Sequence, residues 1–208
     1  MNIMKLRCQK DIYHQEKTAK LQIIICRADD KYPVHYMVDT VGNVFSQVPE
    51  NYWIERTSPN DQVRLFVGLQ SKGALLQSGM YFFPVEKKDS KFQPVKIKGL
   101  KLRNTETITK EGFIAVKNCY EFCPSTNFRG FQYFEMYSDR QLNALGELLS
   151  ELTRKHNIPS YYKGDCFWSV NDSAKDYDRG IYGETALSED VVYPYPEKRI
   201  VDVLKTIK

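Results

Sequence analysis

The stretch GIYGETALSEDVVYPYPEKRIVDVLK, at Gly180–Lys205, decides the expected fold. It begins with a short apolar run at Gly180–Gly183, which predicts a buried strand. A polar loop follows, and then a Pro-x-Pro turn at Pro194–Pro196. From about Glu197 to Ile207 the apolar residues recur at helical spacing, which predicts a terminal helix. The other segments must therefore fit a chain that ends in a strand, a loop, a turn and a helix.

Four strands are predicted in the first third of the chain. Residues Lys20–Arg27 (KLQIIICR) form a continuous apolar run bounded by charge, which is typical of a buried central strand. Residues Val34–Asp39 alternate as a strand does, Thr40–Asn43 contain a glycine and indicate a hairpin turn, and Val44–Val48 return as the paired strand. A further short strand is expected at Val63–Leu69.

The segment from Leu75 to about Ile114 has a weaker pattern. It holds short β-like pieces at Met80–Val85 and Phe92–Ile97, separated by lysine, aspartate and glycine. Irregular chain of this length in a compact domain is usually functional or an extension. We therefore expect an insertion at about 75–114, in the form of a β-rich hairpin or a long decorated loop rather than a separate domain.

The clearest helix follows an aromatic run at Phe128–Tyr137. Ser138 or Asp139 can cap this helix, because either side chain can accept from the free amides of the first turn. Leucines recur at helical spacing on one face, at Leu142, Leu145, Leu148, Leu149 and Leu152. Asn157 and Pro159 are expected to end it.

This order of elements predicts one α/β domain over residues 1–208, with a mixed central β-sheet flanked by helices. A chain of 208 residues is long enough for one sizeable core and marginal for two. Its 42% hydrophobic and 27% charged content is ordinary for a globular protein.

Charge and cysteine usage bound the partners and the compartment. The net charge of +4 is mild, and the basic clusters at Lys87–Lys88 and Lys96–Arg103 are interpreted as solvated loops, so no nucleic-acid partner is expected. No apolar run is long enough to span a bilayer, so no membrane partner is expected either. The five cysteines are an odd number, and the first residues lack the apolar core of a signal peptide. We expect a reducing compartment, the cytoplasm of the producing cell, with packaging in a phage particle as one route to a cell wall.

Four segments match one enzyme family in order and spacing. They are HYMVDTVGNVFSQVPE at His35–Glu50, FRGFQYFEMYSDRQLNALGELLSELTRKHNIP at Phe128–Pro159, KGDCFWSVNDSAKDYDRGIYGE at Lys163–Glu184, and the Pro-x-Pro-Glu start of the terminal helix. Together they resemble the zinc-dependent N-acetylmuramoyl-L-alanine amidases, the family that includes the peptidoglycan recognition proteins and the amidase-type phage lysozymes. The resemblance covers most of the chain outside the insertion and implies an amidase-like fold. The insertion and the aromatic run resemble variants found in Bacteroides-type bacteria and their phages.

The chemistry that this resemblance implies needs a zinc ion with three protein ligands and a water in the fourth position. The metal lowers the pKa of the water to about 7, and the resulting hydroxide attacks the amide between muramic acid and the L-Ala of the stem peptide. The three ligand positions of the family fall on Cys26, Glu184 and about Val192. A glutamate of a middle strand, present in many members, falls near Gly68.

A set of Cys, Glu and Val cannot close a zinc site in the usual catalytic manner. Our first hypothesis is therefore a catalytically inactive amidase homologue with no cofactor, whose partners are proteins in an assembly or peptidoglycan. Cys26 is expected to be a small buried hydrophobe, and Glu184 and Asp190 are expected to be loop carboxylates in water. The expected cleft is formed by Cys26, Tyr36, Gly68, Glu184, Val192 and Tyr193.

Two alternatives remain open at this point. One is a working peptidoglycan amidase with altered ligands, in which Cys26, Glu184 and Asp190 hold zinc. The other is a module that keeps the peptidoglycan-binding groove and not the chemistry.

The remaining candidates are given structural interpretations. His35 is expected to pack on the hairpin with one hydrogen bond, and His14 and His156 are assigned no chemistry. Cys119 and Cys123 have no second pair of ligands nearby, so they support a structural zinc only weakly. The aromatic run at Phe128–Tyr137 could form a platform for a sugar or a partner, but we expect it mainly in the core.

Overall fold

The computed structural model describes most of the chain, with gaps. The described residues are 3–5, 13–15, 19–28, 33–56, 61–78, 81–88, 91–94, 107–108, 114–117, 128–161, 164, 166–167, 169–195 and 197–207. Of the residues considered above, Cys119, Cys123, Pro196 and the basic cluster Lys96–Arg103 lie outside these ranges.

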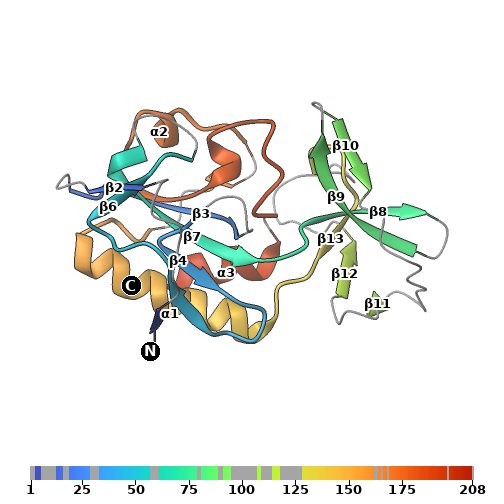
Figure 1. Ribbon diagram of the computed structural model, residues 1–208, viewed down its shortest axis with the longest axis horizontal. Coiled ribbons are helices and arrows are strands. Elements are labelled where there is room, and N and C mark those ends of the chain that lie inside the picture. Colours follow the sequence, from blue (N-terminus) through green and yellow to red (C-terminus); the bar gives the residue numbers. More distant parts are fainter. Residues whose placement is uncertain are drawn as a thin grey trace.

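A mixed sheet of six strands forms the larger part of the molecule (Figure 1). Its order is β1 (Ile3–Lys5), β5 (Val44–Ser46), β4 (Tyr36–Val38), β7 (Arg64–Gln70), β3 (Gln22–Ala28) and β14 (Gly180–Gly183). Strand β3 runs parallel to both of its neighbours, β7 and β14, whereas β4 and β5 form the antiparallel hairpin. The predicted α/β class, the central strand and the hairpin are thus confirmed.

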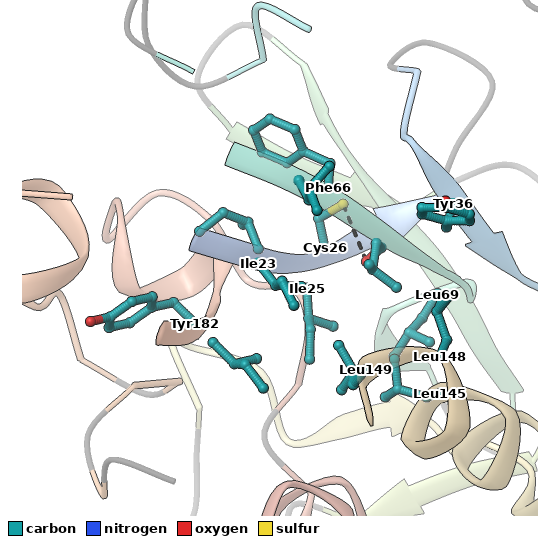
Figure 2. Packing of buried hydrophobic residues seen from close by; sticks show 14 of the residues in the cluster. Ile23, Ile25, Cys26, Tyr36, Phe66, Leu69, Leu145, Leu148, Leu149 and Tyr182 are labelled. Carbon is teal, nitrogen blue, oxygen red and sulfur yellow. Dashed lines mark hydrogen bonds between the residues drawn. The ribbon is translucent and has the colours of Figure 1, made fainter. Parts of the chain in front are cut away.

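Helix α1 (Asp139–His156) covers one face of this sheet (Figure 1). Its first turn is capped by Ser138, whose side chain accepts from the amide of Gln141, and it ends at Asn157 in the left-handed conformation. Figure 2 shows the leucines of α1 on the same side of β3 as Ile23 and Ile25. Helix α3 (Lys198–Thr206) packs against α1 and completes the layer.

Short elements surround the main sheet. A two-stranded sheet pairs β2 (Tyr13–Gln15) with β6 (Tyr52–Ile54), and the 3-10 turn η2 (Asp61–Val63) precedes β7. Helix α2 (Asp172–Lys175) precedes β14, and the turn η3 (Glu184–Ala186) follows it.

A second sheet of six strands lies beside this body (Figure 1). Its order is β10 (Lys91–Pro94), β9 (Tyr81–Lys88), β8 (Ala74–Ser78), β13 (Tyr133–Glu135), β12 (Ile114–Lys117) and β11 (Thr107–Ile108). The insertion expected at about 75–114 falls within this sheet, but β12 and β13 belong to it too, because Phe134 pairs with Ala74. The chain therefore leaves the main sheet after β7 and, once β13 ends at Glu135, continues into α1.

The second sheet has an apolar core of its own, and the C-terminal loop contributes to it. Its members are Ala74, Val85, Phe128, Phe131, Phe134, Val192 and Tyr195. The ring of Tyr195 stacks on Phe134 with 4.0 Å between centroids, and Phe128 meets both rings edge-on. The expectation that the aromatic run is mainly core is confirmed for Phe128, Phe131, Phe134 and Tyr137, which are all buried.

His35 is more fully bound than expected. Its Nδ1 accepts from the amide of Phe66 at 3.0 Å, and its Nε2 lies 3.0 Å from the carbonyl of Tyr52, so the ring carries its proton on Nε2. Burial lowers the pKa of His35 to about 3, which keeps the ring neutral. The side chain thus joins β4, β6 and β7 and serves the fold.

Glu50 ties the hairpin to the end of α1. Its carboxylate accepts from the hydroxyl of Tyr36 and lies 2.7 Å from Nε2 of His156 and 2.8 Å from Nζ of Lys155. Burial alone would raise the pKa of Glu50, but the hydrogen bonds from His156, Lys155 and Tyr36 lower it to about 2. The ionised carboxylate therefore stabilises the folded protein.

Glu50→Gln is expected to lower the melting temperature at pH 7 and to have no effect near pH 2. Because the folded-state pKa lies below the usual value of 4.5, the contribution of Glu50 is complete above about pH 4.5 and is lost as the pH falls toward 2. Thermal unfolding of both proteins between pH 7 and pH 2.5 measures it. Glu147→Gln, at an exposed position of α1, is the matched control. A melting-temperature difference that stays constant over this range would contradict the assignment.

Candidate functional site

The register of the main sheet brings three of the expected cleft positions to one level. Cys26 on β3 pairs with Gly68 on β7, and Ile25 pairs with Gly183 on β14. Glu184 follows Gly183 directly and so begins beside Cys26. These positions gather near the carboxyl ends of three parallel strands, which is where open α/β sheets commonly bind ligands.

Cys26 is fully buried, as expected. Its Sγ donates to the carbonyl of Val67 at 3.7 Å, the contact drawn as a dashed line in Figure 2. The side chain lies beside Phe66, on the opposite side of β3 from the leucines of α1 (Figure 2). A donating sulfur is a protonated thiol, whereas zinc binds the thiolate.

The expectation that Glu184 is a carboxylate in water is wrong. The residue is 7% exposed, and Arg56 holds both of its oxygens, with Nε 2.7 Å from Oε1 and Nη2 3.3 Å from Oε2. Nη2 of Arg56 also donates to the carbonyl of Arg27 at 2.9 Å. A two-point contact between a guanidinium and a carboxylate is among the stronger polar interactions in proteins. It orients Glu184 and neutralises its charge within the fold.

Next to this pair, Arg27 lies over the ring of Tyr193, with 4.8 Å from Cζ to the ring centroid. Tyr193 in turn lies directly against Gly73, where a Cβ atom would be only 1.8 Å from Cε1 of the tyrosine. Gly73 also has a φ of +74°, which favours glycine. Tyr193 is therefore fixed between the main sheet and the start of the second sheet.

The structure does not bring the remaining expected residues into this arrangement. Val192 is 2% exposed and belongs to the core of the second sheet, whereas Cys26 belongs to the main core. The hydroxyl of Tyr36 donates to Glu50, near the end of α1. Asp190 is exposed, as expected.

Arg129 holds the loop that carries Asp190. It lies in a two-residue turn, Arg129-Gly130, in which both residues have positive φ, at 50° and 88°, as type I′ hairpin turns require. Its guanidinium donates to the carbonyls of Thr185, Ser188 and Val191. The turn before β13 thereby fixes the backbone of the loop after β14.

Sequence reasoning missed Arg56 and Arg129. The pair Arg129-Gly130, between Phe128 and Phe131, is a turn signal that could have placed the arginine at a hairpin tip. No local signal connects Arg56 to Glu184, because 128 residues separate them.

Among the residues that the structure describes, no group of three or more His, Cys, Asp or Glu side chains could hold a metal ion. A groove of about 730 Å³ lies elsewhere, between α1 and α3, and Leu142, Gly146, Val203 and Ile207 are among the residues that line it. Within the same described ranges, no helix is both long enough and apolar enough to cross a membrane.

Comparison with known proteins gives no family assignment: no family model matches the chain, and neither does any curated protein.

Proposed function

We propose that this chain is a catalytically inactive homologue of the zinc N-acetylmuramoyl-L-alanine amidases, and that it acts as a structural or interaction protein. The observation that carries the proposal is the pairing of Glu184 with Arg56 at the level of Cys26. Both oxygens of the carboxylate that would have to bind zinc are engaged by a guanidinium. At this position the positive charge beside Glu184 is the guanidinium of Arg56 and not a metal ion.

The environment of the other ligand positions supports the same proposal. Cys26 is closed off from solvent and donates a hydrogen bond, so it would have to lose a proton and a buried contact to bind a metal. Val192 offers no ligand atom and is used for packing. The hairpin, the long helix and the terminal helix come in the order that an amidase-like fold implies. We therefore also propose that the main sheet is the central sheet of an amidase-like fold.

The exposed side chains of Glu189 and Asp190 place part of the loop after β14 on the surface of the protein. We propose a protein assembly as the setting, and a phage particle is one such assembly. A fold can be kept while its chemistry is lost, because the chemistry depends on the identity of a few site residues and not on the fold itself.

The test is incubation of the full chain with purified peptidoglycan, with and without added zinc. The proposal predicts no release of stem peptide under either condition. Release that Cys26→Ala abolishes would overturn the proposal and establish an enzyme with altered ligands, with Asp190→Ala showing whether the third ligand is Asp190. Sedimentation with peptidoglycan separates the two inactive cases, since binding without release identifies a binding module and the absence of both supports a structural subunit.

A further inference from the structure

The groove of about 730 Å³ lies between α1 and α3, which pack against each other on one face of the main sheet (Figure 1). On α1 it is lined by residues between 142 and 154, a length of about 18 Å along the helix. The end of α3 and Ile207 form the other wall. Gly146 lets the two helices approach each other, since a Cβ atom there would lie 3.2 Å from Cγ1 of Val203. The groove therefore has the length of a helix of about three turns.

Three charged side chains line this groove, those of Glu147, Glu151 and Arg154, and all three residues are exposed. Within the described ranges, none of the three has an ion pair or a side-chain hydrogen bond. Other charges of the same helices do have partners, in the pairs Asp139–Arg199, Lys155–Glu50 and Lys198–Asp202. Water can solvate exposed charges, so the feature that indicates a partner is the spacing of the three side chains.

Glu147 and Arg154 carry opposite charges and lie about two turns apart on the same side of α1. When two copies of one helix lie antiparallel about a two-fold axis, residues at equal distances on opposite sides of the axis face each other. An axis beside Ser150 and Glu151 therefore places Glu147 of each copy opposite Arg154 of the other. The surface is complementary to itself, and the two copies form two identical ion pairs.

We propose that this groove is the interface of a homodimer, in which α1 of a second copy lies antiparallel to α1. Leu142, Val203 and Ile207 supply apolar surface to the contact. Gly146 and Ser150 leave room for the second helix, because their side chains are small. A contact of this length is small, so the dimer is weak and reversible. The association is independent of the proposed loss of zinc.

Sedimentation equilibrium of the full chain at about 100 µM tests the proposal, since this concentration populates dimers with micromolar dissociation constants. The wild type should form dimers that dissociate on dilution and at high salt. Glu147→Arg and Arg154→Glu should each weaken the association by about tenfold or more, because each reversal brings like charges together twice. An equimolar mixture of the two variants should associate again, because the mixed dimer regains both ion pairs with exchanged charges.

Glu151 distinguishes a second copy from a basic partner helix. In the antiparallel dimer the two copies of Glu151 lie near the axis and repel each other. Glu151→Gln should therefore strengthen the association by about two- to fivefold, whereas it would weaken the binding of a basic helix. Weaker self-association of Glu151→Gln would contradict the antiparallel placement.

Glu55→Arg is the matched control, because Glu55 is exposed, lies outside the groove and gives the same change in net charge as Glu147→Arg. This variant should sediment as the wild type does. Thermal unfolding at low micromolar concentration observes the monomer, so Glu147→Gln remains a valid stability control there. A wild type that stays monomeric at about 100 µM would overturn the proposal and make another protein the candidate occupant. Dimers that both single variants retain would overturn it as well, as would a mixture of the two variants that does not associate.

Discussion

Asp61→Ala is expected to lower the free energy of unfolding by about 3–5 kcal/mol, because it leaves a buried arginine without its counter-ion. Asp61 is fully buried, and its Oδ1 accepts from Nη1 of Arg64 at 2.7 Å. Arg64 is 2% exposed, and it also donates to neutral oxygens of Gln22 and Ala174. The second oxygen of Asp61 accepts from the amide of Arg56, so the substitution also loosens the segment that presents Arg56 to Glu184.

Chemical denaturation of the wild type and the variant measures this loss. Asp202→Ala is the matched control, because it breaks the exposed pair Lys198–Asp202 at 2.9 Å and should change the unfolding free energy by about 0.5 kcal/mol or less. The double variant Asp61→Leu with Arg64→Met should recover part of the loss, since it leaves no buried charge behind. A loss below about 1 kcal/mol in Asp61→Ala would show that water reaches Arg64, and would contradict the buried network.

Phe134→Ala is expected to cost about 3–5 kcal/mol and to release the C-terminal loop from the second sheet. The ring is fully buried, stacks on Tyr195 at 4.0 Å and meets Phe128 edge-on, so truncation empties the centre of the second core. Phe134→Leu should cost clearly less, because it keeps most of the apolar volume.

Thermal unfolding and amide exchange of residues 192–195 together measure this effect. Tyr133→Ala is the control, because Tyr133 precedes Phe134 in β13, is half-buried, and has its side chain on the other face of the strand. An unchanged exchange rate in the loop of Phe134→Ala would mean that Arg129 alone holds the loop, and would contradict a shared core.

The main sheet could be predicted because its signals are local. Within the run Lys20–Arg27, four successive residues, Ile23 to Cys26, are apolar, so both faces of this strand are expected to be covered. The leucine stripe of α1 and the caps at Ser138 and Asn157 follow from helical period and backbone chemistry, and the structure places them as expected.

The second sheet could be predicted only in part, because its pairing is long-range. Strand β8 pairs with β13 across more than fifty intervening residues, and no period in the sequence indicates that partner. The resemblance to the amidases puts Val192 at about the third ligand position, whereas in the structure Val192 is an apolar residue of the second core. The apolar character of a residue predicts that it is buried, but it does not predict in which of two cores it packs.

In the candidate site, too, the contacts between distant segments could not be predicted from the sequence. The resemblance to the amidases singled out Cys26, Gly68 and Glu184, and the strand register pairs Cys26 with Gly68 and Ile25 with Gly183, the residue before Glu184. What Glu184 does there depends on Arg56, which reaches it from the loop after β6. A buried ion pair between distant segments cannot be recognised from the sequence of either segment alone. For this reason the prediction that Glu184 is an exposed carboxylate was wrong.

The most direct test of the account is the zinc content of the purified full chain, measured by elemental analysis after dialysis against buffer with added zinc. The account predicts far less than one zinc per chain, because Arg56 occupies the oxygens of Glu184 and Cys26 is a buried thiol. It also predicts that Cys26→Ala leaves the zinc content unchanged. A zinc content near one per chain that is lost in Cys26→Ala and in Glu184→Ala would contradict the claim that this site does not bind zinc.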